Sequence, residues 1–186
     1  MQKTIIYQML PRLWGNGKAR PKKNGTLVDN GTGKFSDIDH NTLKYLKWLG
    51  CSHVWYTGVI RHSTQASEEG CIPSHPQFVK GKAGSPYAIC DYYDVNAYLA
   101  DDPQQRMKEF ESLIARTHEA GLKVIIDFVP NHVSRDYGKV NPVPGHPVLG
   151  SDDDTSVHWK PENDFFYYPG QGIKLPTETP AGMEAY

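Results

Sequence analysis

Residues 123–134, Lys-Val-Ile-Ile-Asp-Phe-Val-Pro-Asn-His-Val-Ser, bring three side chains that can bind or orient a substrate into one short segment. Asp127 stands in a nearly continuous apolar run, which predicts a third strand over residues 124–129, covered on both faces. A buried carboxylate is costly unless it is paired or hydrogen-bonded, so Asp127 predicts a partner group inside the fold. Asn131 and His132 follow where this strand is expected to end. In parallel α/β folds, active sites are built at that end of the strands.

The elements before this segment are expected to alternate between strand and helix. Residues 3–10 are predicted to form a first strand, followed by an irregular loop over residues 14–34 that is rich in Gly, Lys and Asn. A helix is expected to begin near Asp37 or Asp39, either of which can cap free backbone N–H groups, and to end at Gly50.

Residues 51–121 are expected to repeat the order of strand, loop and helix. A second strand is predicted over residues 51–57, then a long loop over 61–98, and then a helix that Asp102 and Pro103 open and Gly121 ends. The residues expected on the inner face of that helix are Met107, Phe110, Leu113, Ile114 and Thr117.

Strands that alternate with helices at this spacing predict parallel strands joined by right-handed crossovers. From Ser134 onward the sequence is loop-like, with one compact apolar block at residues 163–168. The three predicted strands and two helices leave a sheet edge uncovered, so the chain is expected to stop in mid-domain.

Composition and charge limit the classes of partner that this chain is expected to bind. The chain has 186 residues, 38% of them hydrophobic and 22% charged, with a formal net charge of −1. Near-neutral charge argues against nucleic acid or an anionic membrane as the main partner. The sequence contains no apolar stretch of ~20 residues, so no membrane span is predicted.

The N-terminus bears on the location of the protein. A predicted strand close to Met1 leaves no room for a secretory signal, which favours a cytoplasmic protein, or an exported one whose signal was removed. Three cysteines, an odd number, suit a reducing compartment.

Four motifs in order resemble the α-amylase family of glycoside hydrolases. Residues 127–132, Asp-Phe-Val-Pro-Asn-His, match the family signature Asp-x-Val-x-Asn-His at the end of the third strand. Residues 6–12, with Tyr-Gln and Pro-Arg, are similar to the family's first strand, and residues 43–50 to its first helix. Residues 85–93, Ser-Pro-Tyr-Ala-Ile-Cys-Asp-Tyr-Tyr, are similar to the loop after strand two. The likeness covers about residues 3 to 134.

The resemblance implies a (β/α)₈ barrel, a fold that takes ~250 residues. Residues 1–134 are then expected to be the N-terminal part of the catalytic barrel, with its first three strands and two helices. Residues 135–186 are expected to be the truncated beginning of the irregular domain B. In this family the nucleophilic Asp, the Glu acid/base and a further Asp follow later strands, so the resemblance places all three beyond Tyr186. No local Asp or Glu is assigned a catalytic role.

The resemblance assigns the substrate-holding part of the site to residues of this chain. His132 is implied to hydrogen-bond the sugar beside the scissile bond, and Tyr87 to stack on the same ring. Asp127 and Asp91 are implied to organise the site, and Asn131 matches an asparagine that often binds a structural calcium. The chain departs from the family at residues 86–88, Pro-Tyr-Ala, where many members have Gly-Tyr-Asp.

The expected function is retaining cleavage of α-1,4-glucans such as starch or maltooligosaccharides, with no cofactor needed for the chemistry. Transglycosylation is the close variant. The alternative from another class is a non-catalytic member of the family that binds sugar or a partner protein. A third hypothesis is an unrelated α/β domain whose Asn-His sequence is accidental.

Single residues also have simpler interpretations. Without the resemblance, His132 is an ordinary strand-end histidine and Asn131 a structural amide. Residues 152–154, three consecutive Asp, are expected to form a solvated turn, and no ligand spacing supports a metal site at His146 or His158.

Overall fold

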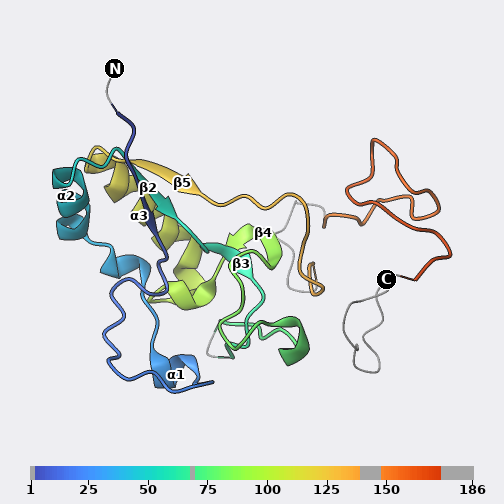
Figure 1. Cartoon of the computed structure of the whole chain (residues 1–186), viewed down its shortest axis with the longest axis horizontal. Coiled ribbons are helices and arrows are strands. Elements are labelled where there is room, and N and C mark those ends of the chain that lie inside the picture. Colours follow the sequence, from blue (N-terminus) through green and yellow to red (C-terminus); the bar gives the residue numbers. More distant parts are fainter. Residues whose placement is uncertain (1–2, 68–69, 139–147, 173–186) are drawn as a thin grey trace. The chain divides into compact units, whose positions relative to one another are not determined.

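The computed structural model describes residues 3–67, 70–138 and 148–172, and the chain divides into two compact units, Met1–Asn141 and Pro142–Tyr186. The regular elements of the described residues lie in the first unit (Figure 1). In chain order they are β1 (Ile6–Met9), α1 (Leu27–Asn30), α2 (His40–Trp48), β2 (His53–Tyr56), β3 (Ile60–His62), β4 (Ile89–Val95), α3 (Arg106–Glu119) and β5 (Lys123–Ile126), with single 3-10 turns at Phe35–Asp37, Pro76–Phe78, Ala97–Leu99 and Pro103–Gln105.

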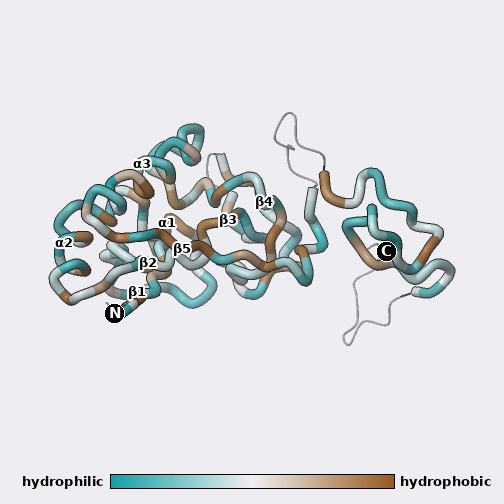
Figure 2. Tube along the Cα trace, turned by 90° about the horizontal axis from the view of Figure 1, so that it is seen from above, coloured by the Kyte–Doolittle hydropathy of each residue, from teal (hydrophilic) through white to brown (hydrophobic). Residues whose placement is uncertain are grey.

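The main sheet has three parallel strands in the order β1-β2-β5. Its register aligns Tyr7 with Val54 and Val54 with Val124. Helix α2 connects β1 to β2, α3 leads into β5, and both helices lie on the same side of the sheet (Figures 1 and 2). The predicted alternation of strand and helix with parallel strands is therefore confirmed. The closed eight-stranded barrel and the boundary at residue 134 stay predictions.

The ends of the helices are fixed by the residues that the sequence indicated. Asp39 caps α2, because its Oδ1 accepts a hydrogen bond from the backbone N of Thr42 at 2.8 Å. Gly50 and Gly121 follow the two helices with φ of +85° and +72°, a conformation that glycine adopts without strain. Asp102 caps the 3-10 turn that runs directly into α3.

The core lies between the sheet and the two helices. Val54 and Tyr56 of β2 are fully buried there, and the phenol of Tyr56 hydrogen-bonds the hydroxyl of Thr117 on α3 at 2.7 Å. Phe110, Leu113 and Thr117 are buried as predicted, but Met107 is 41% exposed. The inner-face prediction was wrong for Met107 because the core does not reach the first turn of α3.

Two predicted loops contain regular structure. Residues 14–34 include α1, whose N-cap Thr26 forms a reciprocal capping box with Asp29. Residues 61–98 include most of an antiparallel hairpin of β3 and β4 with an irregular register. The prediction of a loop was wrong because an irregular pairing between segments about 30 residues apart leaves no simple period in the sequence.

The third strand of the main sheet is shorter and more exposed than predicted. It ends at Ile126, so Asp127 follows the strand and does not lie inside it. Ile126 is 42% and Phe128 is 73% exposed, which contradicts a strand covered on both faces. The reason is that α2 and α3 lie on the same side of the sheet, so no described helix covers its other side at β5. None of the described helices has the length and apolarity needed to cross a bilayer.

Candidate functional site

Asp127 joins the ends of two neighbouring parallel strands. Its Oδ1 accepts a hydrogen bond from the indole Nε1 of Trp55 in β2 at 2.7 Å, and its Oδ2 accepts one from the backbone N of Gly58 at 3.1 Å. The side chain is partly buried, and both carboxylate oxygens have a donor. The partner that the sequence predicts for this carboxylate is therefore a pair of N–H groups beside the end of β2.

Gly58 is the point where three segments approach one another. It has φ of +76°, and a Cβ at this position would lie 3.1 Å from Cβ of Pro86 and 3.2 Å from Cδ1 of Leu10. Leu10 follows β1, and Pro86 precedes Tyr87. The turn that carries Tyr87 and the carboxylate of Asp127 are thus both in contact with the same glycine.

Asn131 and His132 are exposed just beyond the end of β5. Nδ1 of His132 hydrogen-bonds Oδ1 of Asn131. Because an amide oxygen only accepts, this contact requires a proton on Nδ1. In the neutral imidazole, Nε2 is then an acceptor available to a hydroxyl group from outside the chain.

Tyr87 and Asp91 lie in different environments on the same segment. Tyr87 is 44% exposed, and within the described ranges no hydrogen bond or ring contact joins it to His132. Asp91 is buried in β4, and its Oδ1 accepts a hydrogen bond from the backbone N of Tyr93 at 2.8 Å. Burial raises the pKa of the Asp91 carboxyl. Asp91 therefore supports its own strand, whereas Tyr87 faces solvent.

Tyr92 connects the β3–β4 hairpin to the segment that carries Asn131 and His132. Its hydroxyl donates to the backbone O of Val129 and lies 3.5 Å from the backbone O of His132. Its ring contacts those of Phe128 and Tyr137, with centroid distances of 5.7 and 5.9 Å. One tyrosine thus contacts this segment before, at and after the Asn-His pair.

Asp136 forms the centre of a second, buried connection between the same parts. Its Oδ1 accepts hydrogen bonds from Ser63, at 2.6 Å, and from Ser134. Burial raises the pKa of the Asp136 carboxyl, but hydrogen bonds from Ser134, Ser63 and Ser74 outweigh burial and hold that pKa below its usual range. The backbone N of Ser134 also donates to Ile89 of β4 at 2.7 Å. Sequence reasoning missed this cluster, because no short motif marks serines about 70 residues apart.

Sequence reasoning also missed a buried ion pair that fixes the hairpin to α3. Asp94 of β4 is 2.7 Å from Arg106 Nε, on α3, and 3.1 Å from Arg61 Nη1, on β3. The Asp94 side chain is only 5% exposed, so both cations contribute to its neutralisation. The presence of Asp91 and Asp94 in a strand that is largely buried was the available signal.

A pocket of about 560 Å³ lies between two loops of the first unit. One loop follows β1 and contributes residues between Arg12 and Thr32, and the other joins β3 to β4 and contributes Thr64 to Ser67 with Lys82 and Ala83. Neither Tyr87 nor His132 lines this pocket.

The described residues contain no cluster of three His, Cys, Asp or Glu side chains able to hold a metal ion. In the second unit, taken by itself, Asp153 binds the backbone N groups of Asp164 and Phe165 at 2.8 and 3.0 Å. Asp152 is exposed, as expected of a solvated turn, whereas Asp153 organises its loop. His146 lies outside the described residues.

A family model described as "Alpha amylase, catalytic domain" matches residues 20–182. The salivary alpha-glucosidase of Anopheles gambiae is 30% identical over 132 residues, which cover 71% of this chain and 16% of that protein. The trehalose-6-phosphate hydrolase of Bacillus subtilis (strain 168) is 26% identical over 136 residues, covering 73% and 18%. The amino acid transporter heavy chain SLC3A1 of Mus musculus is 27% identical over 129 residues, covering 69% and 14%. The chain thus spans less than a fifth of the length of these relatives.

Two solved structures align with this chain over a similar length. An alpha-amylase from Lactobacillus plantarum aligns with a TM-score of 0.49 and 27% identity, covering 73% of this chain and 24% of that one. The trehalose-6-phosphate hydrolase of Bacillus licheniformis aligns with a TM-score of 0.48 and 26% identity, covering 74% and 19%.

Proposed function

This chain belongs to the family of α-amylase catalytic domains, and from that membership we propose that it provides the sugar-holding part of a retaining glycosidase that acts on α-1,4-glucans. The observation that carries the proposal is the exposed Asn131–His132 pair directly beyond β5. Parallel α/β folds place their active sites at this end of the strands. Asp127, just before the pair, links that end to the neighbouring strand β2.

In the proposed complex, His132 accepts a hydrogen bond from a sugar hydroxyl through Nε2. The contact between Nδ1 and Asn131 supports this role, because it fixes the tautomer and the orientation of the ring. The exposed ring of Tyr87 stacks on the same sugar, since a flat aromatic face suits the C–H surface of a pyranose. Asp127 acts as a positioning residue, because its carboxylate binds the indole N–H of Trp55 and the backbone N–H of Gly58. Asp91 acts within β4, where its carboxylate binds the backbone N–H of Tyr93.

In the proposed mechanism, bond cleavage uses two carboxylates ~5–5.5 Å apart, one as nucleophile and one as acid/base. The family resemblance assigns them to later strands, and no carboxylate of this chain is given either role. Calcium at Asn131 stays a prediction, which a calcium titration of the full-length protein would test. Calcium takes six to eight oxygen ligands, and among the described residues no group of three His, Cys, Asp or Glu side chains is placed to hold a metal ion.

A second candidate is a member that binds a sugar or a protein without cleaving a glycosidic bond. It is considered because one relative is named as an amino acid transporter heavy chain and not as a glycosidase. Both candidates keep His132 and Tyr87 as binding residues. The two candidates differ in turnover of maltooligosaccharide by the full-length protein. Release of reducing ends identifies the glycosidase, and binding without such release identifies the binding member.

The test of the sugar site is a calorimetric titration of the full-length protein with maltoheptaose. His132→Ala is expected to weaken binding about tenfold, the equivalent of one lost hydrogen bond. His118→Ala is the matched control, because His118 is an exposed histidine on α3 and its removal should leave the affinity unchanged. Equal affinity of the wild type and His132→Ala would instead show that the Asn-His pair resembles the family by accident.

A further inference from the structure

Positive charge is concentrated in the segment between β1 and α2. Residues 12–34 carry six Lys or Arg and one Asp, a formal charge of +5 in a chain whose formal charge is −1. Of these six cations, only Lys22 forms an ion pair within the described ranges, with Asp29. Clustered cations with so few counter-charges create a positive potential that attracts anions.

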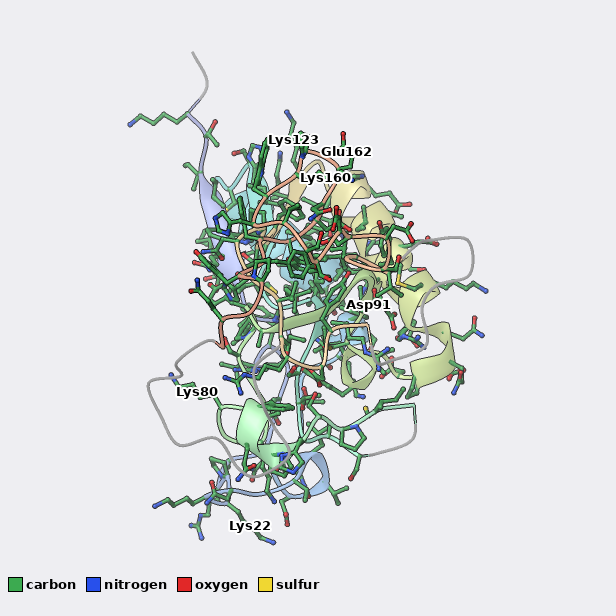
Figure 3. The ribbon with its side chains drawn as sticks, turned by 90° about the vertical axis from the view of Figure 1, so that its right-hand side faces the viewer. Lys22, Lys80, Asp91, Lys123, Lys160 and Glu162 are labelled. Carbon is green, nitrogen blue, oxygen red and sulfur yellow. The ribbon has the colours of Figure 1, made fainter. Side chains whose placement is uncertain are left out.

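The pocket described above opens within this charged region. Its lining includes Arg12, Lys18 and Lys82, and no Asp or Glu is present among the described residues that line it. Lys22 and Lys80 appear in the lower part of Figure 3, on the same two loops that form the pocket. A volume of about 560 Å³ is within the range of small-molecule sites.

The uncharged polar groups of the pocket wall already have partners within the chain. The hydroxyl of Thr64 donates to the backbone O of Lys82 at 3.1 Å, and the amide of Asn16 donates to the backbone O of Asn30 at 3.0 Å. The hydroxyl of Thr26 belongs to the capping box of α1. These hydrogen bonds fix the backbone of the two loops that form the pocket. The ammonium groups of Lys18 and Lys82 take no part in them and are therefore available as donors to a ligand.

Arg12 brings a third positive charge that no carboxylate neutralises within the described chain. Its Nη1 donates to the backbone O atoms of Ala83 and Gly84, at 3.3 and 3.1 Å, which fixes the guanidinium between the two loops. These acceptors are neutral, so the charge remains. Its effect reaches His62, whose pKa falls to about 4 because of burial and the nearby positive charge of Arg12.

We propose that this pocket binds the oxyanion of a small phosphorylated or carboxylated sugar. Three uncompensated cations select the anion, and the remaining volume, lined by Leu13, Leu27 and threonine side chains, accepts the rest of the molecule. Lysine and arginine both form charge-assisted hydrogen bonds to phosphate and carboxylate oxygens. The choice of a sugar as the carrier of the anion rests on the proposed function, whereas the choice of an anion rests on the charges alone.

The test is a calorimetric titration of the full-length protein with glucose 6-phosphate, glucuronate, inorganic phosphate and glucose. Lys18→Gln with Lys82→Gln is expected to weaken binding of the anionic ligands about tenfold, and ~0.2 M salt to weaken it in the wild type. The matched control is Lys44→Gln with Lys108→Gln, which removes the same charge from exposed positions on α2 and α3 that do not line the pocket. All four lysines are exposed, so both double variants should fold.

The result expected is binding of the sugar anions but not of glucose, with loss in the pocket variant and not in the control. Inorganic phosphate binding as tightly as glucose 6-phosphate would support the anion site and identify the free anion as its ligand. Three results would overturn the proposal: glucose binding as tightly as its phosphate, equal loss in both double variants, or no binding of any anion. His132→Ala should not alter anion binding, so the pocket and the sugar site can fail independently.

Discussion

At the scale of single residues, burial and hydrogen bonding decide what each polar side chain can do. His62 is only 1% exposed, its Nδ1 lies 2.8 Å from the amide N of Asn96, and its Nε2 lies 3.2 Å from the hydroxyl of Tyr98. An uncharged ring with its proton on Nε2 satisfies both contacts. His132, by contrast, is exposed and is bonded to its own neighbour in the chain. The two histidines therefore have opposite roles, one structural and one available to a ligand.

The pKa of His62 predicts a loss of stability in acid. Its folded-state pKa of about 4 is below the ordinary value of 6.5, so the unfolded chain binds the proton more readily and stability falls as the pH decreases from 6.5 toward 4. Between pH 7 and pH 5 the contribution of this one group is about 2 kcal/mol.

Urea unfolding at pH 7 and pH 5 checks this, with His62→Gln as the comparison and His40→Gln, at an exposed position of α2, as the matched control. The pH dependence should shrink in His62→Gln and persist in His40→Gln. The same pH dependence in all three proteins would contradict the assignment to His62. The lowered pKa of Asp136 does not contribute in this range, because its carboxyl loses stability only as the pH falls below the ordinary value of 3.8.

At the scale of elements, the β3–β4 hairpin is the scaffold of the proposed sugar site. Its strands provide Tyr92, which contacts the segment 128–137, and Ser63, at the end of β3, contacts Asp136 in the same segment. The ion pairs of Asp94 fix the hairpin to α3, and α3 covers the main sheet. The orientation of Asn131 and His132 thus depends on an element outside the main sheet.

Asp136→Asn is therefore expected to destabilise the fold and to loosen the Asn-His segment. The substitution weakens the acceptor of three serine hydroxyls, at a cost of about 1–3 kcal/mol. Asp152→Asn is the control, because Asp152 is exposed and its replacement should change stability by less than about 0.5 kcal/mol.

The free energy of unfolding gives the first readout, and amide hydrogen exchange over residues 129–138 gives the second. Unaltered exchange there in Asp136→Asn, together with unaltered stability, would show that the serine cluster does not hold this segment.

At the scale of the whole molecule, the described chain provides binding and positioning groups, but three of its buried or partly buried carboxylates have structural partners. Asp94 is paired with two arginines, Asp127 binds N–H groups of the β2 end, and Asp136 binds serines. A glycosidase needs two carboxylates free to act on the substrate. These three carboxylates are thus given structural roles, in agreement with a catalytic pair that the family resemblance assigns to later strands.

The isolated 186-residue chain is accordingly expected to show no measurable hydrolysis of a chromogenic maltooligosaccharide. The measurement is release of nitrophenol from a blocked nitrophenyl maltoheptaoside, with a full-length relative as the positive control. Turnover at the rate of that control would refute the assignment of nucleophile and acid/base to later strands.

The sequence by itself determined the features that depend on neighbours along the chain. The caps at Asp39 and Asp102 and the order of the three parallel strands with their two helices follow from local propensity and period. The position of the Asn-His pair after β5 follows from the same local pattern. Only the tertiary structure decided which N–H groups bind Asp127, how β3 pairs with β4, and that Arg12 and Lys82 line one pocket. These contacts join residues about 30 to 70 positions apart, and they depend on how the folded chain closes its loops and buries charge, which no short-range pattern records.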